Sequence, residues 1–132
     1  MLNLAVRAPL AVALGAIIGA LGRYYFSHWL NPGSSGGFPT GTFVVNMGGC
    51  LLIGAVAALS ERLAPSPELR LLVITGGLGA FTTFSTYSLE SVVLLQRGRL
   101  AAAGLYWLGS ALLGPIILYA GLVLGEQLGP RG

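Results

Sequence analysis

Charged residues divide this chain into long uncharged stretches, and the lengths of these stretches predict its elements. A helix needs about 20 consecutive apolar residues to cross a bilayer. We expect four transmembrane helices, approximately over residues 8–29, 41–60, 69–95 and 100–125. The first span contains Arg23 and ends in aromatic residues, a pattern typical of a membrane interface. Its length and its arginine argue against a cleaved signal peptide.

The third span differs from the others because polar residues interrupt it. Over residues 76–88 it reads GGLGAFTTFSTYS, in which glycines precede six hydroxyl-bearing side chains. Hydroxyls are costly at mid-bilayer depth, and broken membrane helices occur where freed backbone lines a cavity or binds an ion. We therefore expect a helix broken mid-membrane at a functional site. In the alternative, the helix is unbroken and its hydroxyls bond carbonyls of the preceding turn.

Composition supports an all-α integral membrane protein and excludes other classes. Hydrophobic residues make up 55% of the 132 residues and charged residues only 8%, about a third of the usual share. Seven basic and four acidic residues cannot cover a water-facing surface. The net charge of +3 comes from scattered arginines, so we expect no nucleic-acid partner. The single cysteine, Cys50, excludes an intramolecular disulfide and a cysteine-rich metal site.

The basic residues are divided almost evenly between the two ends of the expected helices. One end has Arg7, Arg62, Arg70 and Arg131, and the other has Arg23, Arg97 and Arg99. Orientation in a membrane follows the difference in basic residues between the two sides. A difference of one basic residue gives almost no preference for either orientation, so we expect the protein to insert in both orientations. The alternative is a single orientation that other features determine.

Polar side chains on the second and fourth spans form a candidate site with those of the third. Thr42 and Asn46 are four residues apart and share a helix face, as do Tyr106 and Ser110. These side chains offer donors and no acid, because Glu90 lies at the end of the third span. Asn46 should have a polar partner. Any one of them taken alone is better explained by hydrogen bonds between packed helices.

The same donor set favours a small anion over a cation. The hydroxyls of Ser85 and Thr86 add donors, and the ring edges of Phe84 and Tyr87 are positively polarised. Arg23 could attract anions at an entrance or form an ordinary salt bridge. A cation pathway would be expected to show acidic rings.

Glycines in the first two spans are expected to allow close contact between helices. They are Gly15, Gly19 and Gly22 in the first span and Gly48, Gly49 and Gly54 in the second. None of them requires a ligand.

Three motifs resemble the signatures of one membrane family. They are GALGRY at 19–24, GTFVVNMGG at 41–49 and GGLGAFTTFSTYSLE at 76–90, in three of the four spans. In this order they resemble the fluoride channel family, known as Fluc or CrcB. The resemblance implies a passive, non-enzymatic fluoride channel of microbial plasma membranes that protects cells from fluoride. It also implies an antiparallel, dual-topology homodimer with two pores and a central sodium ion.

The resemblance also assigns roles to individual residues. It places Asn46, Phe84 and Tyr87 in the pore, where phenylalanine is usual at the position of Tyr87. The matching polar track contains Thr42, Tyr106 and Ser110, and Gly114 stands where this track can have another serine. The backbone carbonyls of Gly79 and Thr82 would bind sodium.

Two other classes of protein remain as alternatives. A small multidrug exporter also has four spans and can insert in both orientations, but it needs a carboxylate in its first span for proton coupling. Residues 1–30 contain no acid. A non-transporting assembly subunit would explain the glycines but not the polar residues.

Overall fold

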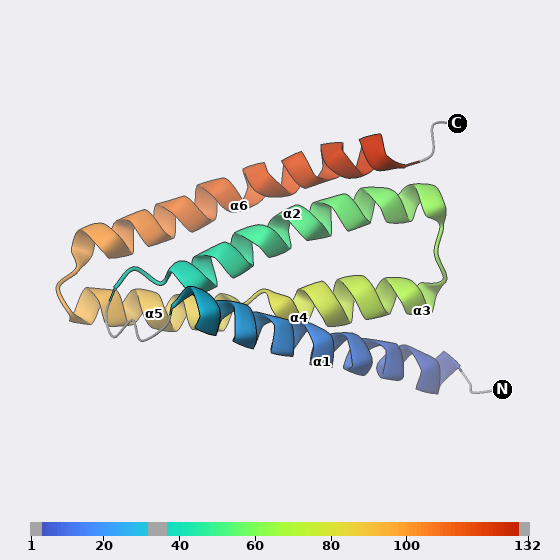
Figure 1. The fold of residues 1–132 in the computed structure, drawn as a ribbon, viewed down its shortest axis with the longest axis horizontal. Coiled ribbons are helices and arrows are strands. Elements are labelled where there is room, and N and C mark those ends of the chain that lie inside the picture. The colour runs from blue at the N-terminus through green and yellow to red at the C-terminus, as the bar shows by residue number, and fades with distance from the viewer. Residues whose placement is uncertain (1–3, 32–36, 130–132) are drawn as a thin grey trace.

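The protein is described by a computed structural model that covers residues 4–31 and 37–129. Its described residues form helices joined by short connections, as Figure 1 shows. The long helices are α1 (Leu4–Leu30), α2 (Thr40–Leu63) and α6 (Leu100–Leu128). Between α2 and α6 lies a composite stretch made of α3 (Pro67–Arg70), η1 (Leu71–Leu78), α4 (Gly79–Phe81) and α5 (Phe84–Gln96).

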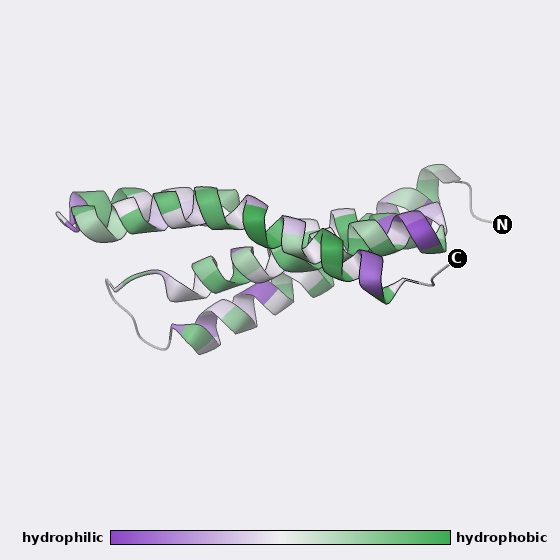
Figure 2. Cartoon of the chain, turned by 90° about the horizontal axis from the view of Figure 1, so that it is seen from above, coloured by the Kyte–Doolittle hydropathy of each residue, from purple (hydrophilic) through white to green (hydrophobic). Residues whose placement is uncertain are grey.

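The described residues contain four helical stretches long and apolar enough to cross a membrane. The expected spans all lie within them, and the observed helices run past most of the expected ends. Apolar residues cover most of the helix lengths (Figure 2), as expected for helices whose solvent is lipid. The four-helix, all-α membrane architecture is therefore confirmed. The start of α1 and the end of α6 lie at the end of the molecule near α3 (Figure 1).

Close packing of α2 against α6 depends on glycines that face the neighbouring backbone. A Cβ added to Gly54 would collide with the carbonyl oxygen of Leu118, and one added to Gly121 would collide with that of Leu51. Small residues at such positions let membrane helices approach closely. The prediction that Gly54 serves packing is confirmed.

The contact between α1 and η1 is built in the same way. A Cβ on Gly15 would collide with the carbonyl oxygen of Leu72, and one on Gly19 with that of Gly77. The packing role predicted for these two α1 glycines is confirmed. The prediction for Gly48 is wrong within this chain, because no atom lies within 4 Å of a Cβ built there.

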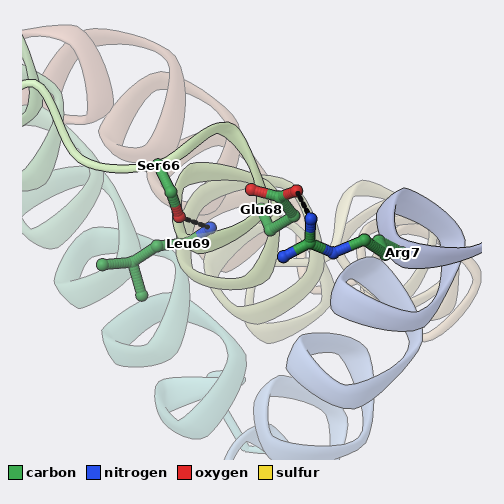
Figure 3. Close-up of polar contacts among 4 residues, drawn as sticks. All are labelled: Arg7, Ser66, Glu68 and Leu69. Atoms are coloured by element: carbon green, nitrogen blue, oxygen red, sulfur yellow. Dashed lines mark hydrogen bonds and ion pairs between the residues drawn. The ribbon is translucent and has the colours of Figure 1, made fainter. Parts of the chain in front are cut away.

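The connection from α2 to the composite stretch has its own stabilising contacts, shown in Figure 3. Ser66 caps α3, its Oγ accepting a hydrogen bond from the Leu69 N–H at 3.2 Å. Nη1 of Arg7 on α1 lies 3.5 Å from Oε1 of Glu68. This ion pair is partly exposed, so it contributes at most about 1 kcal/mol. It ties the first helix to the start of the third stretch.

The composite stretch is irregular in its glycine- and hydroxyl-rich part. Gly76 and Gly77 lie inside the π-helix η1, where their small size allows close contact with α1. Gly76 and Gly77 therefore do not interrupt the helix. Thr82 and Thr83 instead have extended backbone, with φ/ψ of −81°/155° and −148°/119°. Regular helical bonding stops after Phe81 and resumes at Phe84.

Candidate functional site

Asn46 on α2 bonds directly to the extended residue Thr83. Its Nδ2 donates to the Thr83 carbonyl oxygen at 3.1 Å, and its Oδ1 accepts from the Thr83 N–H at 2.8 Å. The side-chain amide thus satisfies both backbone groups of a residue that has left the helix. The prediction that Asn46 has a polar partner is confirmed.

The interruption leaves particular carbonyl groups without their helical donors. In an unbroken helix, Thr83 N–H would bond the Gly79 carbonyl, but here it donates to Asn46. Thr86 N–H would bond the Thr82 carbonyl, but here it donates to Thr83 Oγ1 at 3.2 Å. The carbonyls of Gly79 and Thr82 therefore lack their donors four residues later. These are the two carbonyls assigned to sodium by the family resemblance.

The hydroxyls around the interruption divide into two kinds. Those of Thr82 and Ser88 donate to the carbonyls of Leu78 and Phe84, at 3.2 and 2.9 Å. These two hydroxyls therefore bond carbonyls of the preceding helical turn, as the alternative in the sequence analysis expected. The hydroxyls of residues 83, 85 and 86 instead bond each other, with Thr83 Oγ1 3.1 Å from Thr86 Oγ1 and 3.3 Å from Ser85 Oγ.

Glu90 is the functional candidate that the sequence analysis missed. Thr42 Oγ1 donates to Glu90 Oε1 and Tyr106 OH donates to Glu90 Oε2, both at 2.8 Å. The expectation of a donor set without an acid is therefore wrong, because α5 brings this carboxylate between α2 and α6. Thr83, Thr86 and Glu90 follow helical spacing along one face, and this spacing was a usable signal.

Aromatic rings continue from the interruption to α6. The ring of Phe84 lies 5.7 Å from that of Tyr87, which lies 4.9 Å from that of Tyr106, measured between centroids. The Tyr106 side chain is fully buried, whereas Phe84 is 80% exposed in the single chain. Phe84 thus presents its ring at the outer end of this series.

Two cavities meet at the interruption. The Arg23 cavity, of about 420 Å³, is lined by Arg23, Thr42, Thr86 and Glu90 among others. The Asn46 cavity, of about 440 Å³, is lined by residues that include Asn46, Phe84, Tyr87 and Ser110. Thr83 lines both cavities. Ser85 is exposed and lines neither of them.

Each cavity contains a buried donor that is not satisfied. Over residues 4–31 and 37–129, Arg23 Nε and Ser110 Oγ are buried side-chain atoms with no hydrogen-bond partner. Buried polar groups are normally bonded, so an orphan at a cavity wall suggests a ligand or water that completes it. The Asn46 cavity offers N–H and O–H donors and aromatic ring edges, which can bind an anion. The Arg23 cavity also contains the Glu90 carboxylate, and both of its oxygens accept hydroxyl hydrogen bonds.

The described residues contain no group of three or more histidine, cysteine or acidic side chains able to hold a metal ion. The carbonyls of Gly79 and Thr82 are hard ligands, and such ligands suit a hard cation rather than a thiolate-binding metal.

Four apolar helices around a donor-lined interruption define a small multi-pass membrane protein with a polar interior. The family model described as CrcB-like protein, Camphor Resistance (CrcB), matches residues 10–122, and the chain belongs to this family.

Three relatives that are similar over nearly the whole chain share one name. The protein of Trichormus variabilis named fluoride-specific ion channel FluC is 50% identical over 126 residues, or 94% of this chain and 92% of the relative. A protein of the same name from Synechococcus is 45% identical over 96% of this chain and 98% of its own length. Another protein of this name, from Rhizobium leguminosarum, is 46% identical over 90% of this chain and 96% of its own length.

Proposed function

We propose that this protein is a fluoride-selective ion channel of the plasma membrane. It lets fluoride leave the cell passively and so confers fluoride resistance. The observation that supports this most is the bond pair between Asn46 and Thr83, which places donors and ring edges at one cavity. Membership of the CrcB family and the names of the similar proteins point to the same ion.

The chemistry of the two cavities suits fluoride in particular. Fluoride is small and accepts strong hydrogen bonds, so it gains most from a narrow path lined by donors. Arg23 supplies positive charge in the first cavity, while Asn46 and Ser110 supply donors in the second. The edges of Phe84 and Tyr87 add partial positive charge without a fixed countercharge.

A proton-coupled exporter is the alternative function, and the position of the acid argues against it. No acid occurs in α1, where such an exporter needs its carboxylate. Glu90 lies in the third stretch and accepts two hydroxyl bonds. Fluoride efflux from proteoliposomes without any imposed proton gradient tests this choice. A strict requirement for the gradient would favour the exporter.

The functional unit in this proposal is an antiparallel homodimer with dual topology. The near-even arginine distribution supports it, because neither orientation is favoured. The exposure of Phe84 also supports it, because a pore residue needs a neighbour on its open side. A second copy in the opposite orientation would supply that neighbour, in a closed two-fold assembly.

Topology is tested by reporter tags at the C-terminus. Dual topology predicts tag signal on both sides of the membrane for the unmodified protein. Three lysines added at the C-terminus should bias the orientation and reduce activity, and a copy with the opposite bias should restore it. Tags on one side only would contradict dual topology.

A structural sodium ion at the dimer centre is the third part of the proposal. The carbonyls of Gly79 and Thr82, which lack their helical donors, are the fitting ligands. A two-fold axis would bring four such oxygens together around one hard cation. The ion would hold the interface and supply positive potential near the pores.

Sodium is tested by exchanging it for a large organic cation. The account predicts weaker dimer association and lower fluoride conduction after exhaustive exchange. An intact dimer with undiminished conduction would contradict both roles.

A further inference from the structure

We propose that Cys50 lines the fluoride path and serves as its next donor beyond Ser110. This inference rests on the proposed channel function and adds a residue that the family motifs did not assign. Cys50, Ser110 and Asn46 line the same cavity of about 440 Å³. The sulfur would contribute a weak S–H donor at the cavity wall.

Helical spacing on α6 leaves the polar face without a side chain at one position. Tyr106 and Ser110 lie four residues apart on one face, and the next residue on this face is Gly114. Gly114 has no side chain to continue the series. A Cβ built at Gly114 would lie 3.7 Å from Cys50 Sγ and 3.9 Å from Met47 Cε. The thiol of α2 therefore lies beside the point where α6 lacks a polar group.

Ser110 supplies the independent evidence that this part of the cavity holds a ligand. Its Oγ is buried and has no hydrogen-bond partner within the described part of the chain. Serines in helices commonly satisfy their hydroxyl on the preceding turn, as Ser88 does here. The hydroxyl of Ser110 is left for a ligand or water in the cavity. An anion leaving Ser110 would next meet the Cys50 thiol.

The distances at Gly114 also make a rescue experiment possible. Contacts of 3.7 and 3.9 Å are ordinary van der Waals distances, so the Cβ of a serine at this position would meet α2 without a clash. A hydroxyl at 114 would replace the donor that removal of the thiol takes away. Gly104, also on α6, has no atom within 4 Å of a built Cβ and provides a matched control position.

The first test compares single-channel fluoride currents of Cys50→Ser and Cys50→Ala. The two side chains are close in size and differ in a hydroxyl. We expect the alanine variant to conduct roughly two- to fivefold less than the serine variant, the factor associated with one weak hydrogen bond. Adding Gly114→Ser to Cys50→Ala should raise the current, whereas adding Gly104→Ser should not. Equal currents in the serine and alanine variants would overturn the proposal.

The second test locates the thiol with silver ions in chloride-free solution. Ag⁺ is small and soft, and it binds the cysteine sulfur by displacing the thiol proton. Silver should block fluoride current through the unmodified protein and leave Cys50→Ala unblocked. If the unmodified protein conducts fluoride and silver does not block this current, Cys50 does not lie on the path, and the channel function still stands. A protein without any fluoride current would overturn the channel function and this inference together.

Discussion

Asn46 and Thr83 are joined by two hydrogen bonds across the interruption in the third helical stretch, one in each direction. One N–H of the Asn46 amide is used on the Thr83 carbonyl, and the second remains for a ligand in the cavity that Asn46 lines. The same side chain therefore holds the extended backbone and has one N–H left for the proposed fluoride path.

Substitution of Asn46 should abolish fluoride flux. Asn46→Ala removes both bonds to Thr83 and should lower the free energy of unfolding by about 1–3 kcal/mol. Asn46→Asp keeps an acceptor for Thr83 N–H but places a negative charge beside the anion. Fluoride efflux and thermal unfolding in detergent measure these effects. Ser88→Ala is the control, because the Ser88 hydroxyl bonds a carbonyl of its own helix. Unchanged fluoride flux in either Asn46 variant would refute the role of Asn46.

The two aromatic residues at the start of α5 should differ in sensitivity. Phe84→Ile keeps apolar bulk but removes the polarised ring edge, so we expect impaired fluoride flux. Tyr87→Phe keeps the ring that contacts both Phe84 and Tyr106, so we expect little loss. Fluoride efflux from proteoliposomes checks both variants. Wild-type flux in Phe84→Ile would exclude the ring edge as a contributor.

Removal of the Tyr106 hydroxyl should destabilise the protein. Tyr106→Phe leaves Glu90 Oε2 without its 2.8 Å donor, which comes from a fully buried tyrosine side chain. We expect a loss of about 1–3 kcal/mol in the free energy of unfolding. Tyr119→Phe is the matched control on the same helix, because Tyr119 is 68% exposed. Equal stabilities of the two variants would show that the bond to Glu90 contributes nothing.

The glycine contacts between α2 and α6 give a prediction of opposite sign at two positions. Gly121→Ala should destabilise the protein, because the new methyl collides with the Leu51 carbonyl oxygen. Gly104→Ala meets no atom within 4 Å and should stabilise the helix by about 0.5–1 kcal/mol. Thermal unfolding of both variants provides the measurement. Stabilisation by Gly121→Ala would contradict the observed helix contact.

The four spans were predictable from the sequence because charged residues mark the helix ends, as Arg62 and Arg97 do. The pairing of Asn46 was partly predictable, since a lone amide in an apolar span requires a polar partner. Its partner is the backbone of Thr83, which has no side-chain signature. That bond exists only because the helix is interrupted there.

The bonds of Glu90 and the π-helix at Gly76 and Gly77 were not predicted. Glu90 looked like a span-end acid, and its orientation depends on how α5 restarts after Thr83. The paired glycines looked like helix breakers, but Gly76 is used for contact with Val12 on α1. Glycine permits either outcome, and only tertiary packing decides between them.

The central claim is tested most directly by anion efflux from proteoliposomes that contain the purified protein. Liposomes are loaded with fluoride and chloride together, and the two ions are followed with selective electrodes. The account predicts rapid release of fluoride with chloride retained, because donors on a narrow path favour the smaller anion. Equal release of chloride, or no release of fluoride, would contradict it.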